Sequence, residues 1–164
     1  MNIFIDTEFT DLFDPVLISI GMVADSGEEF YAEVPYPEPQ CTAFVREAVL
    51  PLLGRISGAY CSVFELRVNI LTWLETVRRK DEEVHICADC RTDIDLFYDA
   101  LDYRVPAWLC GALIGSSIDS RLSVEFFKQK GLPQHHALYD ARANKYACGP
   151  DGPAINMLMR IDFG

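Results

Sequence analysis

The order of the apolar segments constrains the fold of this chain most strongly. Three short apolar stretches come first, at residues 2–6, 16–24 and 29–34. The first two contain several isoleucines, the third alternates between apolar and polar residues, and the turn sequence Asp25-Ser26-Gly27 separates the second from the third. Such stretches, bounded by turn residues, are typical of β-strands. The chain is therefore predicted to begin with three strands, of which the second and third are joined by a tight turn in a meander.

Helices are predicted to alternate with strands in the rest of the chain. Ser62 followed by Glu65 has the form of a capping box, and apolar residues spaced three and four apart predict a helix from there to about Arg79. Three strands followed by alternating helices and strands favour an α/β fold, a mixed β-sheet flanked by α-helices. The later elements are predicted as a strand at 83–88, a helix at 93–101, a strand at 108–114, and helices at 119–130 and 137–148.

Length and charge narrow the classes of function. The 164 residues are predicted to form a single domain, 1–164, and the net charge of −11 argues against broad coating of DNA, which requires many basic side chains. An enzyme that holds a few nucleotides at one end is compatible with this charge. The sequence has no apolar run of about 18 residues and no secretory signal pattern, so we expect no membrane partner and a cytoplasmic location.

Six cysteines are present, and in a cytoplasmic protein we expect them to be reduced thiols. Cys87 and Cys90 form a CxxC pair, which is a feature of zinc sites and of thioredoxin-like redox sites. A zinc site needs four ligands; His85 could be a third, and no fourth is evident. The favoured interpretation is a pair of small thiols near the end of a strand.

Acidic residues at both ends of the chain are the strongest functional signal. Asp6 and Glu8 flank Thr7 where the first strand is predicted to end, and alternation along a strand points both carboxylates to the same side. Two carboxylates about 6–7 Å apart could share a pair of hard dications, although a solvated strand end would also explain them. Asp140 lies in the first turn of the last predicted helix, among apolar and small residues, which is an unusual place for a charge unless something binds it.

Taken together, these motifs resemble those of the DEDDh 3′–5′ exonucleases, the superfamily of ribonuclease T, oligoribonuclease and polymerase proofreading domains. The resemblance covers Asp6-Thr7-Glu8, an Asp that opens a mid-chain helix, and the pattern His-x-Ala-x-x-Asp-Ala at 135–141, in the family's order. The segments 4–9 and 17–21 look closest to the ribonuclease T and ribonuclease AS branch. The resemblance implies a ribonuclease H-like fold and a metal-dependent 3′–5′ exonuclease acting on the 3′ end of single-stranded nucleic acid. RNA is favoured over DNA, and the resemblance also implies a homodimer.

Site residues follow from the resemblance by position. Asp6, Glu8 and Asp140 match metal ligands for two divalent cations, Mg²⁺ or Mn²⁺, because hard oxygen ligands favour these ions. His135, five residues before Asp140, matches the general base. Helical spacing alone points instead to His136, which lies four residues before Asp140 and would share its helix face. His136 is interpreted as a start-of-helix residue or a substrate contact.

The second motif leaves three acids in competition, namely Asp89, Asp93 and Asp95. Cys90 stands where the family commonly has an asparagine. Asp93 is chosen as the fourth metal ligand because two apolar residues follow it at the positions that the family pattern requires, Leu96 and Phe97. The other two acids would then stabilise a helix start, as Asp does near a helix N-terminus.

Aromatic and polar neighbours of the first motif are candidate substrate contacts. Thr7 and Phe9 are predicted, with His136, to bind substrate. Phe9 or Phe13 could stack on the terminal base, which is worth about 1–3 kcal/mol per base, or could pack in the core. The one basic run, at residues 78–80, is interpreted as a solvated helix end rather than a track for phosphates.

Other functions are weighed against this one. A 3′–5′ DNA exonuclease on the same fold differs only in substrate preference. A haloacid-dehalogenase-type phosphatase begins with Asp-x-Asp after a strand, but here Glu8 replaces the second Asp, and residues 135–140 would have no role. A catalytically inactive binding domain is disfavoured because every required residue type is present.

Overall fold

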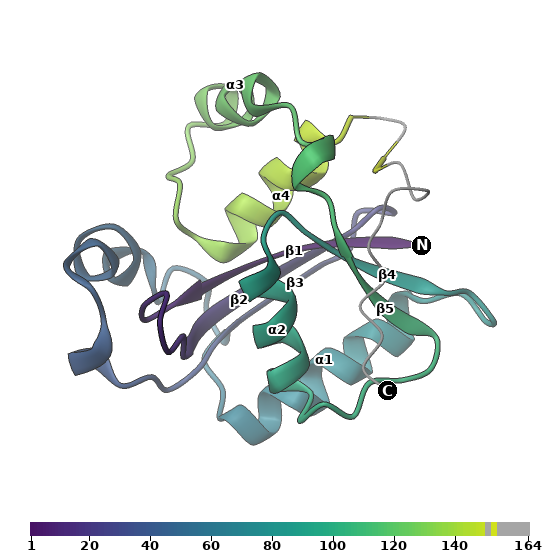
Figure 1. The fold of residues 1–164 in the computed structure, drawn as a ribbon, viewed down its shortest axis with the longest axis horizontal. Coiled ribbons are helices and arrows are strands. Elements are labelled where there is room, and N and C mark those ends of the chain that lie inside the picture. The colour runs from purple at the N-terminus through teal and green to yellow at the C-terminus, as the bar shows by residue number, and fades with distance from the viewer. Residues whose placement is uncertain (150–151, 154–164) are drawn as a thin grey trace.

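The computed structural model describes residues 1–149 and 152–153 and contains one five-stranded sheet of order β3-β2-β1-β4-β5 (Figure 1). β1 (Asn2–Phe9), β2 (Leu17–Ala24) and β3 (Glu29–Glu33) form an antiparallel meander, as the sequence predicted. β4 (Val84–Ala88) and β5 (Leu109–Leu113) extend the sheet parallel to β1. The predicted mixed sheet is therefore confirmed.

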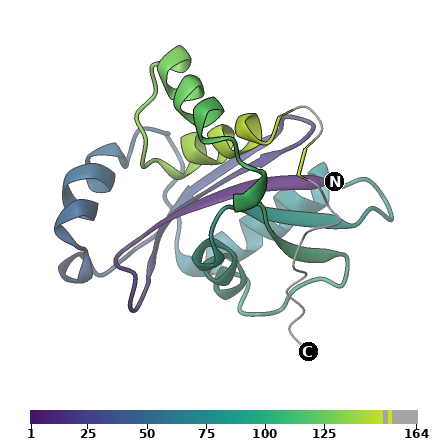
Figure 2. The same cartoon turned by 45° about the horizontal axis from the view of Figure 1, so that its top comes forward.

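Helices cover both faces of this sheet (Figure 2). α1 (Val63–Val77) and α2 (Arg91–Ala100) lie on one face, and α3 (Ser120–Lys130) and α4 (Ala137–Ala147) lie on the other. Alternation along β1 supplies both layers, because Ile3 and Ile5 pack in the main core with α1 and α2, whereas Phe4 belongs to a smaller cluster on the opposite face. The flanking helices predicted from sequence are thus present.

The predicted capping box is present, and the helix boundaries lie within two residues of those predicted from the sequence. Ser62 Oγ accepts a hydrogen bond from the Glu65 N–H at 3.2 Å, and the Glu65 carboxylate accepts one from the Ser62 N–H at 2.8 Å. α1 ends at Val77, two residues before the predicted end, and α2 begins at Arg91, two residues before the predicted start. The earlier start places Asp93 inside the first turn of α2.

The segment between β3 and α1 contains short helical turns that no sequence pattern predicts. These are η1 (Glu38–Gln40), η2 (Val45–Val49) and η3 (Leu50–Leu52), and a further turn, η4 (Gly115–Ser117), follows β5. Cys41, Val45 and Val49 pack on Ile18 of β2, so the turns form a small apolar cluster beside the sheet. In the part of the chain that the structure describes, no helix is both long enough and apolar enough to cross a membrane.

Candidate active site

Asp6 and Glu8 stand within β1 rather than at its end. The strand continues to Phe9, and its register pairs Asp6 with Gly21 and Glu8 with Ser19 of β2. Because side chains alternate along a strand, both carboxylates point to the same face, as predicted. The ladder shifts its register between Glu8 and Phe9, so the irregularity begins directly after the second acid.

Gly21 allows α4 to lie directly against the sheet. A Cβ atom at this position would lie 2.3 Å from the backbone N of Leu138 and 2.4 Å from the carbonyl carbon of Ala137, which is closer than any side chain tolerates. The backbones of β2 and α4 are therefore in contact beside Asp6, the strand partner of Gly21. This contact brings Asp140, in the first turn of α4, close to the acids of β1.

Asp140 completes a cluster of three carboxylates. Oxygen atoms of Asp6, Glu8 and Asp140 all lie within 4.8 Å of one another. The backbone N–H of His136 donates to Asp140 Oδ2 at 2.8 Å, which orients this carboxylate. Burial raises the pKa of Asp140 to about 6, although hydrogen bonds from the backbone at His136 and His135 oppose the rise.

Asp93 enters the same region from α2 and is almost completely buried, with 2% of its surface exposed. Its Oδ1 accepts hydrogen bonds from the backbone N–H of Thr7 at 3.1 Å and from the Thr7 hydroxyl, and its Oδ2 accepts one from the Cys90 thiol at 3.0 Å. Burial raises the pKa of Asp93 to about 6, and these hydrogen bonds from Cys90 and Thr7 limit the rise. Thr7 therefore connects β1 to the start of α2.

The two competing acids of the second motif lie in different places. Asp89 follows β4 and lines the same cavity as Asp93. One of its carboxylate oxygens lies within 4.8 Å of a carboxylate oxygen of Asp93 and of the sulfur of Cys90. Asp95 forms an exposed ion pair with Arg91 at 2.8 Å, and it is not among the described residues that line the cavity. The structure thus brings Asp93 and Asp89 to the cavity and leaves Asp95 on the surface.

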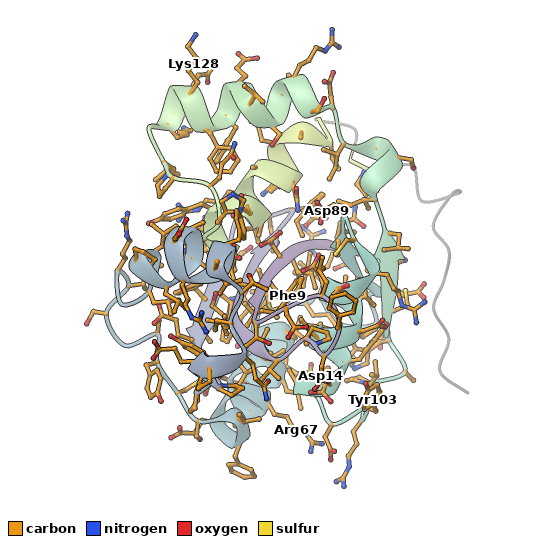
Figure 3. The ribbon with its side chains drawn as sticks, turned by 60° about the vertical axis from the view of Figure 1, so that its left-hand side comes forward. Phe9, Asp14, Arg67, Asp89, Tyr103 and Lys128 are labelled. Atoms are coloured by element: carbon orange, nitrogen blue, oxygen red, sulfur yellow. The ribbon has the colours of Figure 1, made fainter. Side chains whose placement is uncertain are left out.

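One cavity of about 380 Å³ collects most of the predicted site residues, a volume typical of small-molecule sites. Lys128, on the outer side of α3, points away from this region, in which Asp89 and Phe9 lie (Figure 3). The residues that line the cavity are Asp6, Thr7, Glu8, Phe9, Asp89, Cys90, Asp93, Ser123, Phe127, Gln134, His135, Asp140, Ala143 and Asn144.

The two neighbouring histidines have different surroundings. His135 lies outside α4 with a left-handed backbone (φ 65°), lines the cavity, and contacts Phe44 edge to face with ring centroids 4.9 Å apart. His136 is buried in a stack, with its ring centroid 4.5 Å from that of Tyr31 and 3.9 Å from that of Tyr139. Burial lowers the pKa of His136 to about 4. His136 is not among the described residues that line the cavity, and its contact with substrate stays a prediction.

The carboxylates of the cavity raise one another's pKa. Burial raises the pKa of Glu8 to about 8, and the charges of Asp140 and Asp93 contribute further. The pKa of Asp6 is also raised well above its usual value, mainly by burial and then by the surrounding acids, Asp93 first. Removing these groups from water and placing them together disfavours their charged forms, so the cavity would be stabilised by added positive charge.

An apolar hollow of about 470 Å³ adjoins the acidic cavity and shares Glu8 and Phe9 with it. Its other apolar lining residues include Leu12, Phe13 and Phe44. Phe13 is fully exposed and Phe44 is 56% exposed, so the alternative that Phe13 packs in the core is wrong. Exposed aromatic rings thus stand directly beside the carboxylates.

Five lining residues were not singled out from the sequence: Ser123, Phe127, Gln134, Ala143 and Asn144. Asn144 follows Asp140 by four residues on α4, and this helical spacing is the signal that could have identified it. The CxxC pair, in contrast, does not form one site, because Cys90 bonds to Asp93 whereas Cys87 packs with Phe4 and Ala112.

Comparison with known proteins supports the fold. No protein-family model matches the chain, and no curated protein matches it. Among solved structures, the chain is similar to the nuclease domain of 3′hExo, a DEDDh family member, in a crystal structure with bound rAMP. The TM-score is 0.60 and 14% of residues are identical, over 99% of this chain and 96% of that one. The chain has the fold of a DEDDh nuclease domain. The predicted ribonuclease H-like α/β architecture is therefore confirmed.

Proposed function

We propose that the protein is a metal-dependent nuclease that removes nucleotides from the 3′ end of single-stranded nucleic acid, with RNA preferred over DNA. One observation carries the proposal. The four predicted carboxylate ligands and His135 line a single cavity, in a fold similar to that of a DEDDh nuclease domain. The five side chains come from three regions far apart in the sequence, namely Asp6 and Glu8, then Asp93, and then His135 and Asp140.

The donor set fits hard divalent cations. Asp6, Glu8 and Asp140 offer only oxygen atoms, within 4.8 Å of one another, and Asp93 adds a fourth carboxylate. Their raised pKa values reflect burial and mutual repulsion, both of which bound dications would offset. These four residues would hold two Mg²⁺ or Mn²⁺ ions. Such ions neutralise phosphate charge, lower the pKa of water and stabilise a leaving oxygen.

His135 is proposed to accept a proton from the attacking water. Histidine suits this task because it changes charge near neutral pH. Its position before α4 is not bound to the helical path, and the left-handed backbone leaves its ring at the cavity, beside Asp140. The ring of His136 is enclosed by Tyr31 and Tyr139, which favours His135 over His136 as the base.

The terminal base is proposed to rest in the apolar hollow. Phe9 and Phe13 offer ring faces on which a base of any identity can stack. Thr7 and Phe9 also line the cavity and are proposed substrate contacts, with Thr7 additionally orienting Asp93. With a net charge of −11, the protein would neutralise few phosphates, which suits recognition of a strand end rather than of a long duplex.

The two alternative functions differ in which residues of the cavity they would need. A 3′–5′ DNA exonuclease would use the same residues and would lack only a contact to the ribose 2′-hydroxyl. A haloacid-dehalogenase-type phosphatase would not use Asp140 or His135, although both line the cavity beside Asp6. That alternative is not supported by the similarity to a DEDDh nuclease domain.

Degradation of single-stranded RNA and DNA of one sequence, labelled at the 5′ end, tests the proposal. With Mg²⁺ or Mn²⁺ we expect a ladder that shortens one nucleotide at a time from the 3′ end, faster on RNA. Turnover in excess EDTA would exclude the metal-dependent mechanism. Large internal fragments would show an endonuclease, and faster loss of DNA would reverse the substrate preference.

A further inference from the structure

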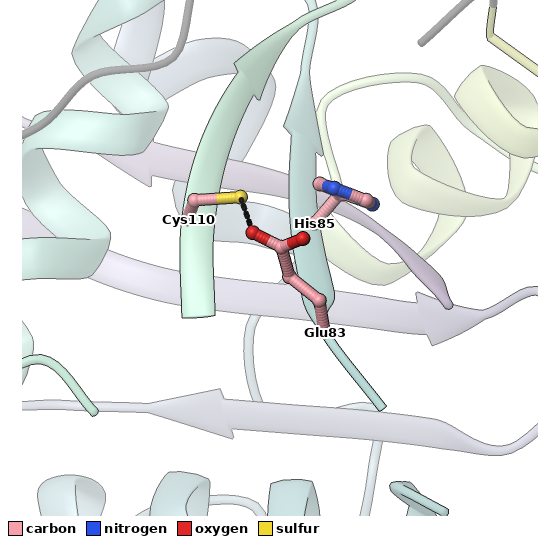
Figure 4. A group of neighbouring side chains, drawn as sticks. All are labelled: Glu83, His85 and Cys110. Atoms are coloured by element: carbon pink, nitrogen blue, oxygen red, sulfur yellow. Dashed lines mark hydrogen bonds between the residues drawn. The ribbon is translucent and has the colours of Figure 1, made fainter. Parts of the chain in front are cut away.

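A second group of metal-binding side chains lies at the amino ends of β4 and β5 (Figure 4). The parallel register places His85 of β4 directly opposite Cys110 of β5. Glu83 precedes His85 by two residues, so alternation turns both toward the face on which Cys110 also lies. The pairing of two neighbouring strands therefore brings a carboxylate, an imidazole and a thiol together.

The spacing of these three groups is close to that of a metal site. One ligating atom of each residue lies within 4.8 Å of the other two. The Cys110 sulfur lies 3.8 Å from Glu83 Oε1. In a tetrahedral zinc site with Zn–S of about 2.3 Å and Zn–O of about 2.0–2.2 Å, a sulfur and an oxygen ligand lie about 3.5 Å apart. Small side-chain adjustments would therefore bring these groups onto one ion.

The donor chemistry selects a different metal from that of the acidic cavity. Thiolate and imidazole are preferred ligands of Zn²⁺ and poor ligands of Mg²⁺ or Mn²⁺. We propose that Glu83, His85 and Cys110 bind one Zn²⁺ ion, with water in the fourth position. Binding forms a Zn–S bond and breaks the S–H bond of Cys110, whose proton passes to the solvent.

This site would be separate from the acidic cavity. The cavity acids lie late in β1, in α4, and beyond the carboxyl end of β4, whereas the three zinc ligands lie at the amino ends of β4 and β5. β5 is an edge strand of the sheet, so one ion held by both strands would fasten this edge to its neighbour. Cys110 is buried while Glu83 is exposed, so the three groups lie where the core meets the surface.

Cobalt substitution in the full-length protein tests which thiol binds. Co²⁺ is added in a large excess of Mg²⁺, which occupies the carboxylate cavity, and a thiolate-to-cobalt charge-transfer band is recorded. We expect the band in the wild type and in Cys90→Ser, the matched control beside Asp93, and its loss in Cys110→Ser. A band that disappears in Cys90→Ser and persists in Cys110→Ser would overturn the proposal, as would its absence in the wild type.

Glu83→Gln gives a second test that does not disturb a buried residue. Calorimetric titration with Zn²⁺ in excess Mg²⁺ should show one ion bound per wild-type chain. Affinity should fall at least about tenfold in the variant, the lower end of what even an outer-sphere substitution costs. Mg²⁺-dependent degradation of RNA should be unchanged. Equal zinc affinity in the variant, or a parallel loss of nuclease activity, would contradict a separate zinc site.

Discussion

The two ends of β4 present metal-binding groups of different chemistry. At its carboxyl end, Asp93 meets the carboxylates of β1 and α4, and the ligands proposed there are all oxygen atoms. At its amino end, His85 is joined by a thiol and a carboxylate that come from β5 and from the residue before β4. The two proposed sites thus lie at opposite ends of one strand, and the ion expected at each follows from its donor atoms rather than from the fold.

The largest expected effect comes from removing one carboxylate of the acidic cavity, which should leave the proposed zinc site at the other end of β4 intact. Asp140→Asn should abolish nearly all nuclease activity, because the amide has one carbonyl oxygen and no charge to offer to a cation. Circular dichroism should show that the variant folds, and its cobalt–thiolate band should remain. Nuclease rates above about one tenth of the wild-type value would remove Asp140 from the proposed ligands.

The next largest effect on nuclease activity is expected from the acids of the second motif. Asp93→Ala is compared with Asp95→Ala. The first should abolish activity, whereas the second should leave it close to wild type because Asp95 forms an exposed ion pair with Arg91. Asp89→Ala should be milder than Asp93→Ala, although Asp89 lines the same cavity. Rates are compared on single-stranded RNA in Mg²⁺. An inactive Asp95 variant beside an active Asp93 variant would move the ligand by two residues.

The adjacent histidines offer a smaller and more specific contrast. His135→Ala should lower kcat by roughly 10²–10⁴ and flatten the acid limb of its pH profile, because a general base is lost. His136→Phe retains an aromatic ring between Tyr31 and Tyr139 and should keep that limb. The profiles are measured with saturating Mg²⁺. If His136→Phe flattens the acid limb and His135→Ala keeps it, the general base is His136 and the third motif is assigned one residue too early.

The smallest expected effect is thermal. Carboxyl groups whose pKa is raised on folding bind protons more tightly in the folded state, so stability without metal falls as pH rises. The relevant interval runs from about 4 to 8, since the pKa of Asp93 and of Asp140 is raised to about 6 and that of Glu8 to about 8.

Mg²⁺ should offset this loss at the acidic cavity. At a concentration one hundred times its Kd, Mg²⁺ would stabilise the protein by about 2.7 kcal/mol, or roughly 5–10 °C in Tm. Scanning calorimetry should show a larger shift at pH 8 than at pH 6, and a smaller one in Asp140→Asn. Equal shifts in the wild type and this variant would place Mg²⁺ elsewhere.

Most of the fold could be predicted because its signals are local. The apolar strands of the meander, the capping box of Ser62 and Glu65, and the periodic helices all appear in the structure. β1 continues beyond its predicted end: in sequence Asp6 and Glu8 resemble a polar strand end, whereas in the structure the strand itself carries them to the cavity. The turns at 38–52 could not be predicted, since they pack on Ile18 through contacts that no short pattern encodes.

Part of the candidate site could also be predicted, because some of its signals are local in the sequence. Strand alternation alone predicts Asp6 and Glu8 on one face, and the unusual position of Asp140 marks it as a candidate site residue, which the structure places beside them. The hydrogen bonds from Thr7 to Asp93 and the backbone conformation of His135 depend on tertiary contacts. The CxxC motif pairs Cys87 with Cys90, its neighbour in the sequence. The cluster of Glu83, His85 and Cys110 instead depends on the register between β4 and β5, which sequence spacing does not reveal.

The contact at Gly21 has a consequence for the order in which the molecule matures. The acids of β1 are synthesised first, whereas Asp140 arrives only near the end of the described chain and must close a very long loop to meet them. It does so when α4 comes to rest on the bare backbone of β2. A growing or truncated chain that ends before residue 137 can contain the whole sheet and still lack a complete set of carboxylates. The proposed nuclease would therefore remain inactive toward nearby nucleic acid until α4 has been synthesised and has folded onto the sheet.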